Sequence, residues 1–185
     1  YNKDYQESEN LCVIMSKYTL EGMKEEPSPI IMGPVAKTIQ ESFPDEVECA
    51  SITKEFGYSP YFLGENSYNC RTTYADTLFF QTLGIVVKLG NVKELANPDM
   101  AFISDDLAKR IFGAENPVGK VLMKDKNHEI MVRGVFKQIG ENNSIRPDIV
   151  ISFANITKYF GWYFGWGGGD SFTCYVRLHP DVDVE

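Results

Sequence analysis

Residues 102–148 decide the fold of this chain. They read F-I-S-D-D-L-A-K-R-I-F-G-A-E-N-P-V-G-K-V-L from Phe102 to Leu122 and E-I-M-V-R-G-V-F-K-Q-I-G-E-N-N-S-I-R-P-D from Glu129 to Asp148. The pattern predicts the end of a strand, a short helix, a tight turn, and a pair of strands that ends in a polar loop. None of these parts has the residue pattern of a catalytic site.

The predicted helix carries signals at both ends. Ser104 can act as the N-cap by accepting a hydrogen bond from a free backbone N–H, and two acidic residues follow it at the positive end of the helix dipole. Gly113 stands where a left-handed residue commonly ends a helix. The apolar face recurs at helical spacing and comprises Leu107, Ala108, Ile111 and Phe112.

The run from Gly113 to Lys120, G-A-E-N-P-V-G-K, is similar to a phosphate-binding loop but lacks its essentials. That motif has four residues between its glycines, Ser or Thr after the Lys, a strand before it and a helix after it. Here five residues intervene, Val121 follows Lys120, and a predicted helix precedes the run. We therefore expect a structural turn containing Pro117 and Gly119, and no nucleotide binding.

A series of motifs resembles the extracytoplasmic core domain of MacB-type and FtsX-like ABC transporter permeases. The series comprises I-S-D-D-L-A-K-R-I-F-G-A-E-N-P-V-G-K, then V-R-G-V-F, then N-S-I-R-P-D. The segments Ala75–Gly90 and Trp166–Leu178 are also similar to the family, and the resemblance is strongest from Thr77 onward. The motif residues for which it implies structural roles are Ser104, Phe112, Gly113, Asn116, Pro117, Gly119, Lys120, Gly134, Val135, Asn143, Ser144, Asp148, Gly168 and Asp170.

The residues before this stretch predict a strand, a helix and a second strand. The strand is expected at Leu11–Tyr18, the helix at Ile30–Phe43 with Pro34 in its first turn, and the second strand at Val47–Phe56. Tyr58–Cys70 is rich in Gly, Ser, Asn and Tyr, which predicts a loop or hairpin at a lobe boundary.

The predicted fold class is α+β with two lobes. Residues 1–57 and 171–185 are expected to form a porter-like lobe, to which the chain returns at Ser171–Leu178, and residues 58–170 an inserted, β-rich lobe with short helices. The family resemblance implies the same arrangement. A complete porter-like lobe needs a further helix and strand, so this one could be incomplete at its C-terminus.

Composition limits the classes of function. The 185 residues are 43% hydrophobic and 13% aromatic, which indicates a folded chain, and the net charge of -8 argues against a nucleic-acid partner. No window reaches the roughly 18 consecutive apolar residues of a membrane span, so we expect an excised, soluble domain. Cys12, Cys49, Cys70 and Cys174 form no metal-binding motif with the two histidines. Cys174 is expected to be a buried thiol, and disulfide formation stays open.

The resemblance implies a function without catalysis or a cofactor. Such a domain lies on the extracytoplasmic, periplasmic side of a bacterial cytoplasmic membrane and transmits ATP-driven movement to a substrate or adaptor. The implied partners are the membrane helices of its own permease, a separate or fused cytoplasmic ATPase domain, a periplasmic adaptor and a second permease copy. The alternative is a small-molecule sensor or solute-binding domain, which needs an enclosed pocket with convergent polar groups.

Two segments could carry a binding surface. Asn142, Asn143 and Ser144 form either a polar binding loop or a turn that satisfies its own backbone. Trp162, Phe164 and Trp166 recur at every second position and point to one side of an extended segment. They either cover the core or form an apolar patch for a partner, and we expect one Trp to be partly exposed.

Overall fold

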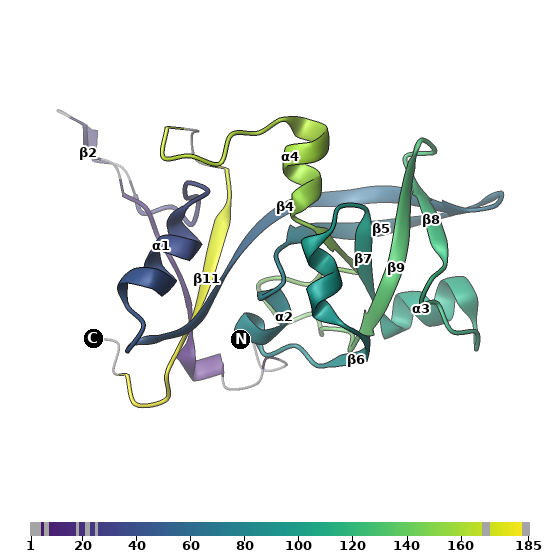
Figure 1. The fold of residues 1–185 in the computed structure, drawn as a ribbon, viewed down its shortest axis with the longest axis horizontal. Helices are drawn as coiled ribbons and strands as arrows, with labels where there is room; N and C mark the ends of the chain where they lie inside the picture. The colour runs from purple at the N-terminus through teal and green to yellow at the C-terminus, as the bar shows by residue number, and fades with distance from the viewer. Residues whose placement is uncertain are drawn as a thin grey trace.

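The computed structural model describes residues 5, 8–17, 19–20, 23–24, 26–167 and 171–182. They form a nine-stranded mixed sheet with short helices, an α+β fold (Figure 1). In spatial order the path is β1 (Leu11–Val13), β11 (Thr173–Leu178), β4 (Val47–Leu63), β5 (Asn66–Ala75), β10 (Ile149–Ser152), β7 (Met100–Ser104), β9 (His128–Phe136) and β6 (Val87–Gly90). Off this path, β8 (Val121–Lys124) pairs with β4 and β9. β2 (Thr19–Leu20) and β3 (Met23–Lys24) form a separate two-stranded sheet.

The helices are short and cover both faces of the sheet. They are η1 (Ser8–Asn10), α1 (Val35–Ser42), α2 (Phe79–Leu83), η2 (Val92–Ala96), α3 (Asp105–Phe112) and α4 (Ala154–Phe160). One buried cluster includes residues of α1, α3 and α4, and a second includes residues of α2 and η2. Neighbouring residues of β10 alternate between them, with Ile149 and Ile151 in the first cluster and Val150 in the second. The sheet therefore has a hydrophobic core on each side.

The predicted strand-helix-strand unit is present, with different bounds. β1 ends at Val13, before the predicted end of the strand. The helix begins at Val35 with Pro34 as its N-cap residue, so the prediction that it starts at Ile30 is wrong. Ile31 instead forms an isolated antiparallel bridge with Phe172, because its backbone joins the sheet before the chain turns into α1.

The second strand continues past its predicted end at Phe56. β4 runs for 17 residues, and its ladder to β5 contains an irregularity between Glu55 and Gly57 but does not stop there. Tyr58–Cys70 is a hairpin within this ladder. Figure 1 shows β4 extending from the end that carries α1 to the opposite end, beyond β9. One sheet thus crosses the proposed boundary at residues 57/58. The division into two lobes stays a prediction.

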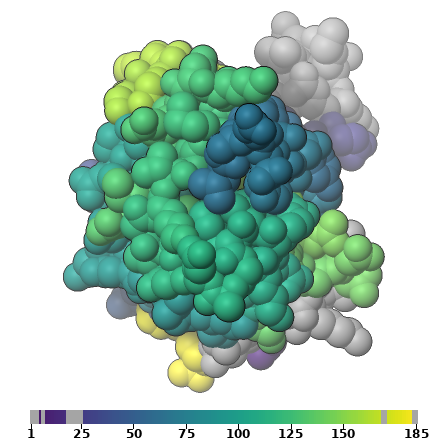
Figure 2. Space-filling model, turned by 90° about the vertical axis from the view of Figure 1, so that its right-hand side faces the viewer, coloured from purple at the N-terminus to yellow at the C-terminus, as the bar shows by residue number. Residues whose placement is uncertain are grey.

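The hairpin end of the molecule is closed by β8, β9 and α3. β8 is antiparallel to both β4 and β9, and this pairing holds the hairpin against the rest of the sheet. Figure 2 shows this end, with residues near 100–130 across the middle and the blue hairpin at its upper part. The predicted strands around Val121, Glu129–Phe136 and Ile149–Phe153 are confirmed.

β11 is buried on both faces. Cys174 and Val176 lie in the first cluster, as the predicted buried thiol at Cys174 requires. On the other face Arg177 is 4% exposed, and its Nε donates to the backbone carbonyls of Gln81 and Thr82 at the end of α2. A cation is favourable at a helix C-terminus. Arg177 is therefore buried, although a charged residue in the sequence usually indicates an exposed position.

Candidate partner surface

The aromatic segment 161–167 begins where α4 ends. Gly161 has the left-handed conformation with φ 61° and ψ 22°, and its N–H donates to the carbonyl of Thr157 at 3.3 Å. This conformation costs glycine little and redirects the chain out of the helix. In Figure 1 the chain then passes from α4 along the upper edge toward β11.

Two of the three predicted surface residues anchor this segment to the core. The ring centroid of Trp162 lies 5.9 Å from those of Phe160 and Phe172, and the Lys54 ammonium lies 5.4 Å from that of Trp162. The Phe164 centroid lies 4.9 Å from that of Phe153 and 5.1 Å from that of Phe172. Trp162 and Phe164 are half-buried, and such aromatic pairs add to the stability gained from burial.

The turn before α1 approaches this segment closely. A Cβ atom built on Gly33 lies 2.8 Å from Cδ1 of Phe164 and 3.1 Å from its carbonyl oxygen. Both distances are shorter than ordinary van der Waals contact, so a side chain at residue 33 would displace the segment. Glycine at this position therefore lets the aromatic segment pack against the start of α1.

Other aromatic side chains remain exposed to solvent. Trp166 is 57% exposed and Tyr163 is 68% exposed, with the ring of Tyr163 folded over Gly165. The expected partial exposure of one Trp is confirmed. We call the exposed aromatic side chains of α4 and the following segment the aromatic surface: Tyr159, Phe160, Tyr163 and Trp166.

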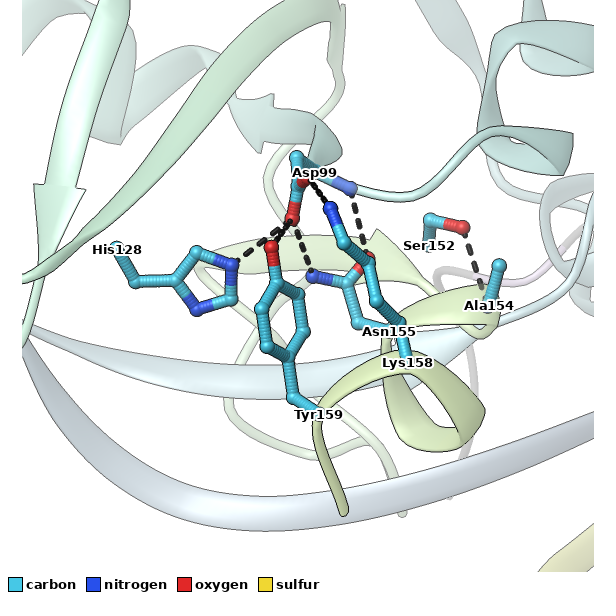
Figure 3. A network of polar contacts seen from close by, with 7 residues as sticks. All are labelled: Asp99, His128, Ser152, Ala154, Asn155, Lys158 and Tyr159. Carbon is cyan, nitrogen blue, oxygen red and sulfur yellow. Dashed lines mark hydrogen bonds and ion pairs between the residues drawn. The ribbon is translucent and has the colours of Figure 1, made fainter. Parts of the chain in front are cut away.

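Asp99, a residue that precedes β7, holds both turns of α4 (Figure 3). Its carboxylate accepts hydrogen bonds from Asn155 Nδ2 at 3.1 Å, Lys158 Nζ at 2.5 Å and Tyr159 Oη at 2.8 Å. His128 Nε2, at the start of β9, lies 2.8 Å from the same carboxylate. We call these five residues the Asp99 cluster. It ties α4 to two strands of the sheet.

Asp99 itself has an unusual backbone conformation. Its φ is 64°, which is uncommon for a residue other than glycine, and its N–H donates to Asn155 Oδ1 at 2.8 Å. Partial burial raises the pKa of its carboxyl, but the hydrogen bonds from Lys158, His128 and Tyr159 outweigh this and lower it. This cluster was not predicted from the sequence because its members come from three separated segments. The run Asn97-Pro98-Asp99 was the available signal for a turn.

The predicted ends of α3 are largely confirmed. Ser104 is its N-cap, and the Leu107 N–H donates to Ser104 Oγ at 3.1 Å. Gly113 ends it with φ 64°, as expected, but ψ is -119°. The specific prediction of a left-handed helical conformation at Gly113 is therefore wrong. The observed pair of angles lies even further from those that residues with a Cβ atom adopt.

The turn predicted between Gly113 and Lys120 is confirmed. Asn116 Oδ1 accepts a hydrogen bond from the Val118 N–H at 3.0 Å, and Gly119 has φ 88° and donates its N–H to the Val132 carbonyl. Lys120 forms an ion pair with Glu115, and its ammonium lies over the ring of Phe112. β8 begins at Val121. The run thus leads from a helix into a strand, which is not the setting of a phosphate-binding loop.

The remaining motif residues have varied surroundings. Gly134 of β9 lies against the ring of Phe102 in the neighbouring strand β7, and Val135 is buried. Asn143 donates from Nδ2 to the Gly140 carbonyl at 3.0 Å, which supports the turn interpretation of that loop. Ser144 is exposed. Phe112 and Pro117 are also buried, and Asp148 is partly buried. Gly168 and Asp170 lie outside the described residues.

No enclosed pocket accompanies the aromatic segment in the described part of the chain. The segment borders an open depression of about 250 Å³, which is lined by Trp162, Tyr163, Ser171 and Phe172. This is below the roughly 300–1,000 Å³ typical of small-molecule sites. The described residues also contain no group of three or more His, Cys, Asp or Glu side chains placed to hold a metal ion.

The cysteines are free thiols, and burial raises the pKa of Cys70 to about 11 and that of Cys174 to about 12. None of the described helices is long and apolar enough to cross a bilayer.

Residues 1–185 match the family of MacB-like periplasmic core domains. The chain belongs to this family. It is therefore an extracytoplasmic domain of a MacB-like ABC transporter permease, on the periplasmic side of the membrane. Membership implies permease membrane helices and an ATPase as partners. No curated protein matches the chain significantly.

Solved structures of related domains share the fold. A domain of a protein assigned as a permease from Porphyromonas gingivalis is 27% identical with a TM-score of 0.78, and the match covers 97% of this chain and 80% of that one. The periplasmic region of MacB from Actinobacillus actinomycetemcomitans is 15% identical with a TM-score of 0.68, covering 94% and 77%. The extracellular domain of the noncanonical ABC-type transporter YknZ from Gram-positive bacteria is 14% identical with a TM-score of 0.64, covering 92% and 83%.

Proposed function

We propose that this domain moves as a stiff body, without catalysis, and transmits movement driven by cytoplasmic ATP hydrolysis to a partner on the outer side of the membrane. The observation that carries the proposal is the single sheet that runs through the molecule, with β4 extending between its two ends. Both faces of this sheet are covered by buried side chains. Densely packed interiors deform little and transmit displacement.

The position of the aromatic surface supports a role in contacting that partner. Leu11 of β1 pairs with Arg177, so the described chain enters and leaves the sheet at the same end of β11. The aromatic segment precedes Thr173, at the opposite end of β11 (Figure 1). If the ends of the domain connect to membrane helices, the aromatic surface faces away from the membrane. Exposed aromatic side chains are enriched at protein interfaces, and the proposed partner is a periplasmic adaptor or a second permease copy.

The stiff-body proposal can be tested by a distance measurement. Phe43 and Glu65 are exposed and lie just before and just after β4. In a full permease with Cys12 replaced by Ser, spin labels at cysteines introduced at residues 43 and 65 report the internal length of the domain. We expect the same distance in the nucleotide-free and ATP-bound states, while the distance from residue 65 to a label on a membrane helix changes. A change of the internal distance with nucleotide would contradict the proposal.

A further inference from the structure

Tyr5 is a buried tyrosine near the start of the chain. It is 3% exposed and belongs to the cluster that contains Phe79 and Phe80 of α2. Its hydroxyl donates to the carbonyl of Ile145 at 2.5 Å and accepts from the N–H of Ile145 at 3.3 Å. The Tyr5 hydroxyl thus forms hydrogen bonds with both the carbonyl and the N–H of Ile145, which lies 140 positions further along the chain.

Ile145 lies in the loop that joins β9 to β10. This loop, residues 137–148, has no regular secondary structure, yet Ile139 and Ile145 are 3% and 1% exposed. Buried backbone N–H and carbonyl groups need hydrogen-bond partners, and a loop of this kind has no ladder to provide them. Tyr5 supplies both partners at Ile145, inside the N-S-I-R-P-D motif.

The two ends of the loop are tied to other elements. Asp148 accepts the Arg71 N–H on its carboxylate at 2.8 Å, donates its own N–H to the Arg71 carbonyl, and accepts the Ser104 N–H on its carbonyl. At the other end, the Gln138 N–H donates to Asp105 Oδ1 at 2.8 Å. The loop therefore connects Tyr5 to β5 and to the first residues of α3.

We propose that the β9–β10 loop is the anchoring site of Tyr5, and that Tyr5, this loop and the start of α3 form one cooperative unit. The proposal gives the N-S-I-R-P-D motif a role as the receptor for the Tyr5 side chain. A displacement of the chain at Tyr5 then reaches β5 and α3 through the hydrogen bonds of the loop. This inference goes beyond the proposed function and does not depend on it.

The direct test is hydrogen exchange of the 185-residue chain measured by NMR. Tyr5→Phe keeps the ring and removes the hydroxyl, so the Ile145 amide loses its acceptor. We expect its exchange to accelerate about tenfold, the effect of losing a typical buried hydrogen bond, and the Ser104 and Leu107 amides to accelerate several-fold.

Tyr175→Phe is the matched control. Tyr175 is 5% exposed in the same cluster, and its hydroxyl has no hydrogen-bond partner among the described residues. This variant should leave the Ile145 amide unchanged. Unchanged exchange at Ile145 in Tyr5→Phe would overturn the proposal. So would equal acceleration across the whole sheet, including Thr73 and Val150, because Tyr5 would then be an ordinary core residue.

A second variant tests cooperativity from the other direction. Asp148→Ala removes the carboxylate that accepts the Arg71 N–H, at the far end of the loop from Gln138. Because coupling between two sites is reciprocal, we expect the ring resonances of Tyr5 to shift and broaden. Tyr5 resonances identical to those of the unmodified chain, with Ile145 exchange raised by Asp148→Ala, would overturn the single-unit proposal.

Discussion

Residues 102–148 and residues 159–167 use their side chains in opposite ways. In the first region the motif residues cap α3, complete a turn or allow strands to approach, and their polar groups are mostly satisfied within the domain. In the second region Trp162 and Phe164 hold the chain to the core while Tyr163 and Trp166 remain exposed. The comparison indicates that the recognisable motifs specify the fold. The exposed aromatic side chains lie in a segment whose pattern is much less distinctive.

The largest expected effect on stability is at Gly134, in the first region. A Cβ atom there lies 2.0 Å from Cε1 of Phe102, which is fully buried, and 2.4 Å from the Leu89 carbonyl oxygen. Overpacking of this kind typically costs about 1–3 kcal/mol, and we expect Gly134→Ala to lower the free energy of unfolding by about 3 kcal/mol.

The matched control is Gly167→Ala, since a Cβ at Gly167 meets no atom within 4 Å. It should leave the midpoint of chemical denaturation nearly unchanged. Equal midpoints for the two variants would remove the contrast between the regions.

A smaller effect is expected at Gly113. Its Cβ position is open, so the cost of Gly113→Val comes only from the backbone angles φ 64° and ψ -119°. Such strain costs about 1–2 kcal/mol. Chemical denaturation should show this loss, and Ala114→Val, which adds the same side chain one position later, should show less than half of it. Two equal losses would mean that the end of α3 tolerates a side chain.

The local signals of the first region explain how much of the fold was predictable. The cap at Ser104, the turn at Asn116–Lys120 and the strands that follow depend on neighbours in the sequence, and each was predicted. The continuation of β4 past Phe56 was not, because Gly57 and Pro60 read as signals that end a strand. Those residues lie in an outer stretch of the ladder, where the pairing with β5 overrides local preference.

The candidate site was only partly predictable. Alternation identified Trp162, Phe164 and Trp166, but it could not show which ring packs against Phe172, because that contact depends on tertiary structure. The Asp99 cluster and the burial of Tyr5 depend on contacts between distant segments, and a single sequence gives no direct signal of them.

The Asp99 cluster gives a smaller, pH-dependent effect. The pKa of the Asp99 carboxyl in the folded chain lies below its ordinary value of 3.8. The stabilisation from its charged form is therefore complete above that value and is lost as the pH falls toward the folded pKa. We expect Asp99→Asn to be less stable than the unmodified chain at pH 7 and the difference to shrink below about pH 4.

Denaturation midpoints across this pH range provide the measurement. Asp45→Asn is the control, because Asp45 is an exposed carboxylate in the turn between α1 and β4. A stability difference for Asp99→Asn that stays constant from pH 7 to pH 3 would show that the charge of Asp99 does not stabilise α4.

We propose that Tyr163 and Trp166, the most exposed side chains of the aromatic surface, serve a partner and contribute little to the fold. The most direct test of this central claim is Trp166→Ala in the full permease, compared with Phe43→Ala, since Trp166 and Phe43 are 57% and 52% exposed. We predict that Trp166→Ala reduces transport several-fold, that Phe43→Ala leaves it unchanged, and that both change the free energy of unfolding of the domain by less than about 0.5 kcal/mol. A large loss of stability in Trp166→Ala, with normal transport per folded molecule, would assign Trp166 to the core and contradict the claim.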